Sequence, residues 1–194
     1  MSTNLEELKI VRIGHHISIG SLNEVQEIIL RAFRGLIRKC NLTHYNIPPI
    51  DQIDALLLTQ ILNDEFGGQH VLGITDADLT LADAPEGYIF GGKNTQTNVA
   101  VVSTKRLCPQ DFTLEESYNL YLSRIAKESL HEVGHNFGLT HHYTYQSSKD
   151  GRHCPMTKGD FKRFGEIGYV RAIIDGRGYM FCDICTKFLQ RFHI

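Results

Sequence analysis

The segment HEVGHNFGLTH, residues 131–141, constrains the fold of this chain more than any other feature. His131 and His135 are four residues apart, so on a helix both imidazoles lie on one face and can bind one ion. Gly138 allows the backbone to leave the helix sharply, and the chain can then bring His141 back as a third ligand. The segment therefore predicts a helix that ends in a glycine turn beside a metal centre.

The same segment predicts the chemistry of that centre. Three nitrogen ligands leave a fourth position open for water, as a catalytic zinc ion requires. Zinc lowers the pKa of bound water from about 16 to about 7 and polarises a carbonyl group. Glu132 follows the first ligand, so its carboxylate can take the proton of the water and pass it to a leaving amine. The spacing H-E-x-x-H-x-x-G-x-x-H is typical of metzincins, which are zinc metallopeptidases.

Two other functions stay open at this point. The chain could be a catalytically weak, zinc-stabilised module that binds peptides, or a zinc hydrolase of a non-peptide substrate. Glu132 favours catalysis, because a binding module has no need of a general base at that position. The alternative is a polar helix end that binds no metal. It is a poor explanation, because all five fixed positions of the H-E-x-x-H-x-x-G-x-x-H motif would have to match by chance.

The cysteines indicate a second metal site. The chain has five: Cys40, Cys108, Cys154, Cys182 and Cys185. An odd number is a poor disulfide framework. Three of them fall in the last 41 residues, and two of these form a C-x-x-C pair, a spacing found in structural zinc sites. A redox pair is the alternative, but a third nearby cysteine favours metal binding. We expect Cys40 and Cys108 to be small buried apolar side chains.

The hydrophobic pattern predicts one mixed α/β domain over residues 1–194. An upper part, about 1–138, would hold the sheet and the active-site helix, and a lower part, about 139–194, the remaining sites. We expect strand 98–104 to be the sheet edge that pairs with an extended peptide, because it contains no Lys or Pro. The other expected elements are a strand over 8–13, a helix over 22–39, a helix over 52–65 capped by Asp51, strands over 71–75 and 88–92, a helix from the capping box of Thr113 and Glu116 to Gly138, and a helical turn within 186–192.

Charge and composition exclude several partners. The formal net charge is −2 and the pI is about 6.5, which argues against nucleic acid or an anionic membrane as the main partner. No apolar run approaches the roughly 20 residues that span a bilayer. The first residues have neither the basic nor the apolar segment of a signal peptide. We therefore expect a cytoplasmic monomer that acts on a peptide or protein.

Residues 8–189 resemble the archaemetzincins, a branch of the metzincin clan. Cys154-Pro155-Met156 and Cys182-Asp183-Ile184-Cys185 match the C-x-M and C-x-x-C motifs of that family, and 71–80 and 98–107 resemble its central and edge strands. The resemblance implies a metzincin-like zincin fold: a mixed twisted sheet with an active-site helix, and a small C-terminal subdomain. It also implies a Met-turn, in which Met156 lies beneath the catalytic zinc.

The resemblance further implies a second, structural zinc, so that the chain would bind two zinc ions. We expect Cys154, Cys182 and Cys185 to be ligands, with His142 as the fourth. The family usually has a cysteine directly after the third histidine, where this chain has His142, and a Cys₃His shell is also a recognised structural combination. His153 is the rival, although its position next to Cys154 makes it harder for both side chains to reach one ion.

Overall fold

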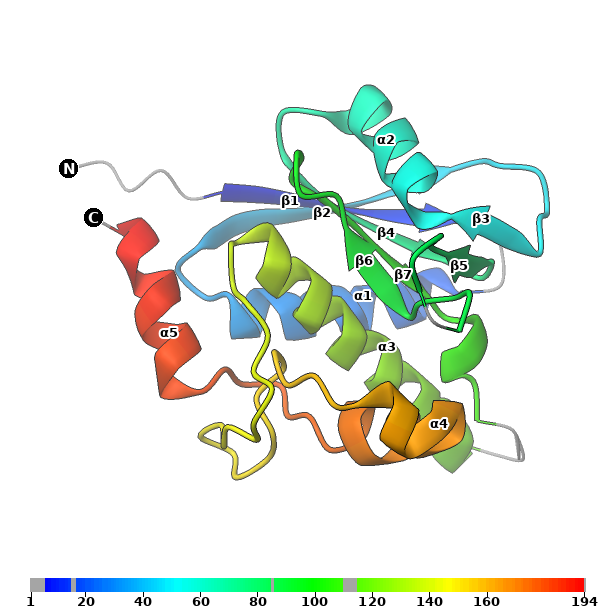
Figure 1. Cartoon of the computed structure of the whole chain (residues 1–194). Helices are drawn as coiled ribbons and strands as arrows, with labels where there is room; N and C mark the ends of the chain where they lie inside the picture. The colour runs from blue at the N-terminus through cyan, green and yellow to red at the C-terminus, as the bar shows by residue number, and fades with distance from the viewer. Residues whose placement is uncertain (1–5, 15–16, 85, 110–114, 194) are drawn as a thin grey trace.

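A twisted five-stranded sheet forms the centre of the molecule (Figure 1). The computed structural model describes residues 6–14, 17–84, 86–109 and 115–193. The strand order is β2-β1-β4-β7-β6; the first four strands are parallel, and the short β6 runs antiparallel to β7. The strands are β1 (Glu6–Ile13), β2 (Ile37–Tyr45), β4 (His70–Thr75), β7 (Val99–Ser103) and β6 (Gly91–Lys93); β3 (Gln52–Asp54) and β5 (Asp78–Thr80) form a separate parallel pair.

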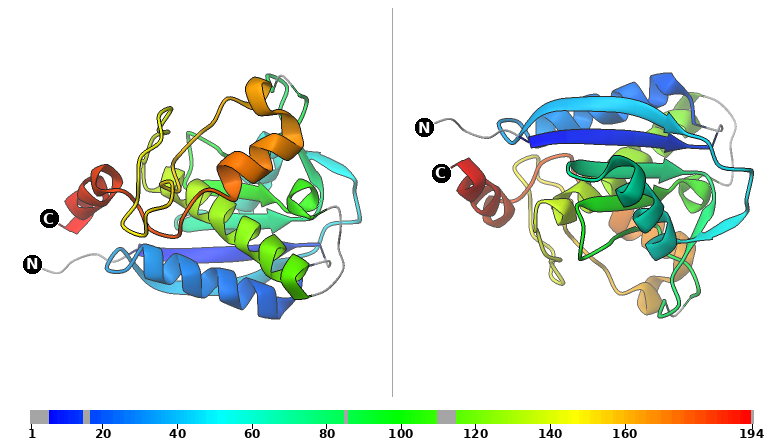
Figure 2. Two further views of the ribbon diagram at one scale, coloured as in Figure 1. Left: turned by 90° about the horizontal axis from the view of Figure 1, so that it is seen from below. Right: turned by 90° about the horizontal axis from the view of Figure 1, so that it is seen from above.

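Helices cover both faces of this sheet (Figures 1 and 2). Helices α1 (Ile19–Ala32) and α3 (Glu115–Asn136) lie on one face, and α2 (Ala55–Phe66) lies on the other. Successive residues of a strand point to opposite faces, so each central strand contributes to both layers. In β4, for example, Leu72 packs in the α1 and α3 layer, whereas Val71 packs in the α2 layer.

Residues after α3 form a smaller layer beneath that helix. This segment contains α4 (Phe161–Tyr169), the π-helix η2 (Val170–Ile174), α5 (Asp183–Leu189) and the 3₁₀ helix η3 (Gln190–His193). Seen from below, α3 lies between α1 and α4 (Figure 2). The predicted mixed α/β class is confirmed, and the long helix α3 carries His131 and His135.

Several expected elements match the structure, and several do not. The strands at 8–13 and 71–75 and the long helix that ends before Gly138 are confirmed as β1, β4 and α3. The turn expected within 186–192 lies in α5 and η3. Thr113, the expected cap of α3, lies outside the described residues.

The helix expected over 22–39 is wrong at its end. Helix α1 stops at Ala32, Gly35 adopts a positive φ of 89°, and Ile37–Tyr45 form strand β2. A positive φ is incompatible with a continuing right-handed helix. Helix α2 likewise begins three residues later than expected, because Asp54 rather than Asp51 accepts the hydrogen bond from the Leu57 amide, at 2.8 Å.

The expected sheet edge is also wrong. Strand β7, the predicted edge at 98–104, lies between β4 and β6, so its backbone groups are paired on both sides. The edge on this side of the sheet is β6, opposite the edge strand β2. Strand β6 spans Gly91–Lys93, whereas the expected strand covered 88–92. Glycine has a low strand propensity, which is why this edge gave little sequence signal.

Candidate metal centres

Helix α3 presents the first candidate centre. His131 and His135 lie on its last two turns, and Gly138 ends it with a φ of 80°. The Gly138 amide donates to the His135 carbonyl and the Leu139 amide to the Gly134 carbonyl, both at 3.0 Å. These bonds close the helix end in the manner of a glycine C-cap. The chain then turns back and places His141 beside the two helical histidines.

The three histidines, hereafter the His triad, converge through their Nε2 atoms. The Nε2–Nε2 distances are 3.1 Å for His131–His141, 3.2 Å for His131–His135 and 3.0 Å for His135–His141. Nδ1 of His131 donates to the Pro155 carbonyl at 2.8 Å, and Nδ1 of His135 donates to the Leu139 carbonyl at 2.7 Å. Because a carbonyl only accepts, these bonds leave the Nε2 lone pairs of both rings free for an ion.

This arrangement fits a metal ion. Three nitrogen lone pairs this close repel one another unless a cation lies between them, and the spacing suits Zn–N bonds of about 2.0–2.1 Å. Burial lowers the pKa of His131 well below its ordinary value and that of His141 to about 3. Both rings are therefore held neutral, which is the state that binds metal.

Glu132 lies buried beside the His triad. The residue is 3% exposed, and its Oε2 atom has no hydrogen-bond partner within the described part of the chain. Burial, together with the charge of Glu128, raises the pKa of this carboxyl well above its usual range. Strand β6 packs closely against it: a Cβ atom on Gly91 would lie only 2.7 Å from Cγ and Oε1 of Glu132. Gly91 thus leaves the space in which the carboxylate sits.

A cavity of about 780 Å³ opens over the His triad and Glu132. The edge strand β6 forms one wall, and residues 158–162 form the other. Phe90, Phe161 and Tyr169 contribute aromatic rings that pack against one another near this cavity. The cavity therefore joins the candidate metal centre to the outer edge of β6, which pairs with no other strand in the described part of the chain.

Met156 lies beneath α3 and is fully buried. The Thr157 amide donates to the Cys154 carbonyl at 2.9 Å, which closes a tight turn around Pro155 and Met156. The sulfur of Met156 lies so close to Gly134 of α3 that a Cβ atom there would be 2.5 Å from it. Met156 therefore lies in a tight turn against the helix that carries His131 and His135, and its role as a Met-turn stays a prediction.

A second candidate centre lies next to the first. We call it the Cys₃His cluster, made of His142, Cys154, Cys182 and Cys185, whose ligand atoms lie within 4.8 Å of one another. Nε2 of His142 is 3.1 Å from Sγ of Cys185 and 3.3 Å from Sγ of Cys182, and the sulfurs of Cys154 and Cys185 are 3.8 Å apart. The hydrogen bond between Cys154 and Cys185 lowers the pKa of the Cys154 thiol to about 5, which favours a thiolate.

The remaining histidine and cysteines lie elsewhere. His153 stacks on Tyr145 at 4.4 Å and is not part of the cluster, so the geometry favours His142 as the fourth ligand. Cys40 is half-buried in β2, but Cys108 is exposed, contrary to expectation, because it lies in the loop after the 3₁₀ helix η1 (Lys105–Leu107).

Arg177, which sequence reasoning missed, is 1% exposed and lies beneath the cavity. Its Nη1 atom is 2.6 Å from Oε2 of Glu128, and its Nε and Nη2 atoms donate to the Thr157 carbonyl at 3.0 and 2.8 Å. Glu128 lies one turn before Glu132 on α3. Through its ion pair with Glu128 and its hydrogen bonds to Thr157, Arg177 links α3 to the turn that carries Met156.

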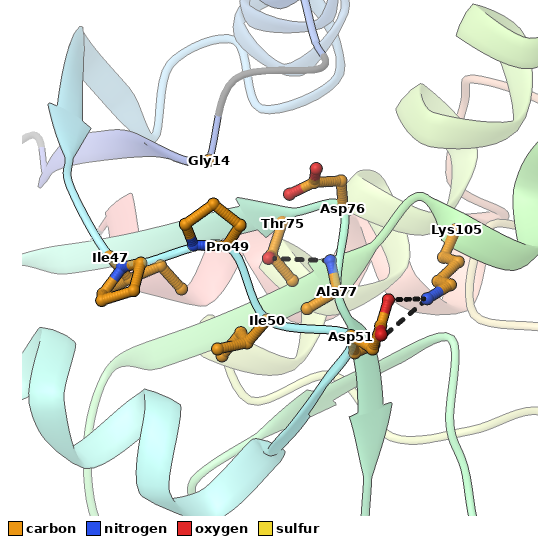
Figure 3. A pocket seen from close by; sticks show the side chains of 10 residues that line it. Gly14, Ile47, Pro49, Ile50, Asp51, Thr75, Asp76, Ala77 and Lys105 are labelled. Atoms are coloured by element: carbon orange, nitrogen blue, oxygen red, sulfur yellow. Dashed lines mark hydrogen bonds and ion pairs between the residues drawn. The ribbon is translucent and has the colours of Figure 1, made fainter.

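A smaller hollow of about 430 Å³ lies at the carboxyl ends of β1 and β4 (Figure 3). Gly14 and Asp76 face each other there, and Nζ of Lys105 is 3.3 Å from Oδ1 of Asp51. None of the residues that line this hollow belongs to the His triad or to the Cys₃His cluster. It is therefore not the candidate active site. Each helix formed by the described residues is too short or too polar to span a lipid bilayer.

Comparison with known proteins agrees with this geometry. The archaemetzincin of Pyrococcus furiosus is 28% identical over 132 residues, which cover 67% of this chain and 58% of that protein. The archaemetzincin of Methanopyrus kandleri is 33% identical over 121 residues, covering 62% of this chain and 55% of that protein. These sequence matches thus span less than two thirds of the relatives' length.

Solved structures match over a longer range. The crystal structure of archaemetzincin from Methanopyrus kandleri has a TM-score of 0.72 and 26% identity, covering 97% of this chain and 95% of that one. Archaemetzincin from Archaeoglobus fulgidus, complexed with malonate, has a TM-score of 0.65 and shares the fold at 18% identity, covering 94% of this chain and 99% of that one. The family model of Peptidase family M54 matches residues 53–153, just over half of the chain. The chain therefore belongs to Peptidase family M54.

Proposed function

We propose that this chain is a zinc-dependent metallopeptidase that hydrolyses peptide bonds through its His triad and Glu132. The observation that carries the proposal is the convergence of three Nε2 atoms at 3.0–3.2 Å beside a buried carboxylate with an unpartnered oxygen. A merely structural ion would need four protein ligands, whereas three leave a position open at the cavity.

The His triad would hold the zinc ion, with the carbonyls of Pro155 and Leu139 keeping the first two rings in the metal-binding tautomer. When bound, zinc would supply an acidified water molecule and a Lewis acid for the scissile carbonyl. Glu132 would accept the proton of that water and deliver it to the leaving amine. Its buried position beside Gly91 keeps the carboxylate close to the triad and away from competing hydrogen bonds.

The substrate would lie extended along β6, the wall of the cavity. Strand β6 is an edge strand, so one row of its backbone groups can pair with an added strand. Gly91 and Gly92 present no side chains that would hold a peptide away from this edge. We propose that the chain acts on peptides as a monomer.

We also propose that the Cys₃His cluster binds a second zinc ion with a structural role. Four ligands close the shell and leave no position for water, as in other structural zinc sites. The chain would then bind two zinc ions with different tasks.

Cleavage of a peptide library, read by mass spectrometry, tests the proposed activity. Zinc-loaded protein should cleave, and Glu132→Ala should lose at least about a hundredfold of the rate while keeping its zinc, because a general base is typically worth 10²–10⁴-fold. Glu116→Ala, an exposed glutamate on the same helix, is the matched control and should cleave at the native rate.

Two results would count against this proposal. Equal cleavage by the wild type and Glu132→Ala would show that Glu132 is not the base. Absence of cleavage by any zinc-loaded form would favour a peptide-binding module or a hydrolase of another substrate.

A further inference from the structure

The two candidate metal centres share two short segments of chain. His141 belongs to the His triad, and its neighbour His142 belongs to the Cys₃His cluster. Cys154 belongs to the cluster, and its neighbour Pro155 supplies the carbonyl that accepts the Nδ1 hydrogen of His131 at 2.8 Å. Each segment therefore carries one group of each centre, separated by a single peptide bond.

These two segments are also bonded to each other. The His142 amide donates to the Met156 carbonyl at 2.9 Å, and the Lys158 amide donates to the His142 carbonyl at 2.9 Å. Residues 141–142 and 154–158 lie outside the helices and extended strands, and a single isolated bridge joins His142 to Thr157. A few hydrogen bonds thus hold the backbone that presents His141.

The ligands of the Cys₃His cluster come from both of these segments and from a third segment, residues 182–185. Cys182 immediately precedes α5, and Cys185 lies within that helix. One ion bound by the cluster would hold 142, 154 and α5 in a single shell. A shell of this kind restrains chain positions more strongly than isolated hydrogen bonds, since structural zinc can contribute on the order of 10 kcal/mol to folding.

Arg177 provides a competing restraint. Its guanidinium donates twice to the Thr157 carbonyl, so it can hold the second segment without any ion. Among the described residues, the hydrogen bonds of Arg177 reach neither His141 nor His142. If Arg177 alone fixed the region, the cluster would have no influence on the triad.

We propose that His142 and Cys154 are positioning residues for the His triad: an ion bound by the Cys₃His cluster fixes His141 and the Pro155 carbonyl, and so strengthens metal binding by the triad. This inference rests on the metal-binding triad of the proposed function but not on peptide cleavage. Linkage makes the effect reciprocal, so an ion in the triad must strengthen binding at the cluster by the same factor.

The double variant Cys182→Ser, Cys185→Ser tests this, because both positions lie outside the two shared segments. Neither substitution therefore removes a group that contacts the triad ligands directly. Cobalt reports the centres separately: thiolate charge-transfer absorption arises only at the cluster, whereas visible d–d bands arise at both centres. Zinc affinity of the triad is measured by competition with a chelator. The matched control is Cys40→Ser, Cys108→Ser, which removes two cysteines outside the cluster.

We expect the double variant to bind zinc in the triad about 10–100-fold more weakly than the wild type, as loss of an outer partner of a metal ligand typically does. Its triad d–d bands should change in position or intensity, while the control matches the wild type. His142→Cys should keep both centres, because four cysteines also form a structural zinc shell. Unchanged triad affinity and d–d bands after loss of the cluster ion would overturn the proposal.

If the double variant does not fold, the same coupling can be measured in the opposite direction, as the effect of the triad on metal binding by the cluster. His135→Ala removes a triad ligand without touching either shared segment. The thiolate charge-transfer titration should then show weaker cobalt binding at the cluster than in wild-type protein whose triad is filled. Equal cluster affinities would overturn the coupling, even if the protein cleaves peptides normally. Conversely, a protein that cleaves no peptide could still show the coupling.

Discussion

Residues 6–136 and residues 137–193 are held together by different physical means. The first region has a sheet with apolar layers on both faces, and its central strands are almost fully buried. The second adds apolar side chains, such as Ile173 and Leu189, to the core layer beneath α3, but it has only short helices and isolated backbone bridges, and it contains a fully buried arginine and the Cys₃His cluster. Stability in the first region comes mainly from apolar burial, which is spread over many residues.

This difference predicts how the stability of each region responds to substitutions. An apolar core loses stability in steps as single side chains are trimmed. A region organised by a few polar groups depends on each of them, because a buried charge or thiolate without its partner is costly. The His triad spans the boundary, with two ligands on α3 and the third beyond Gly138.

The largest expected effect is the removal of the cluster ligands. Cys182→Ser, Cys185→Ser should loosen residues 143–193, since structural zinc contributes on the order of 10 kcal/mol in small zinc domains, while the ion in the His triad still holds His141. Hydrogen exchange read by mass spectrometry should show fast exchange there and continued protection of β1, β4 and β7. Exchange that rises equally in both regions would show that the two are not held separately.

The next effect concerns the buried ion pair of the second region. Arg177→Met leaves Glu128 buried without its cation and should lower the free energy of unfolding by about 3–5 kcal/mol. Denaturant unfolding measures this loss. Arg171→Met, at an exposed arginine, is the matched control and should change stability by less than about 0.5 kcal/mol. Equal stability of the two variants would contradict the role given to Arg177.

Truncation of a buried apolar side chain in the first region should lower the free energy of unfolding by a similar or smaller amount. Leu72→Ala creates a cavity in the central strand β4 and should lower the free energy of unfolding by about 2–5 kcal/mol. Zinc content should stay unchanged, because the sheet does not contain the ligands. Leu57→Ala, at a leucine that is 56% exposed, is the control. A loss of zinc in Leu72→Ala would show that the sheet and the metal centres are more tightly coupled than described.

The same contrast explains what could be predicted from the sequence. Helix α3 carries a strong 3.6-residue pattern and the metal motif, and β1 and β4 are short apolar runs, so all three were predicted near their true positions. The grouping of His142 with the three cysteines was also anticipated, through the family resemblance.

The missed features have weak local signals. Strand β2 is an edge strand with mostly half-exposed residues, so it lacks a clear alternation of buried and exposed positions. Strand β6 contains two glycines, and its place at the edge depends on tertiary pairing. Arg177 acts through contacts with residues 20 and 49 positions away, which no local pattern reveals.

The zinc content of single chains, measured by native mass spectrometry at saturating zinc, tests the central claim that two different metal centres exist. The wild type should bind two zinc ions, Cys182→Ser, Cys185→Ser should bind one, and His131→Ala, His135→Ala should bind one. A wild type that binds a single zinc ion, retained in the cysteine variant, would contradict the account, because the Cys₃His cluster would then not be a metal site.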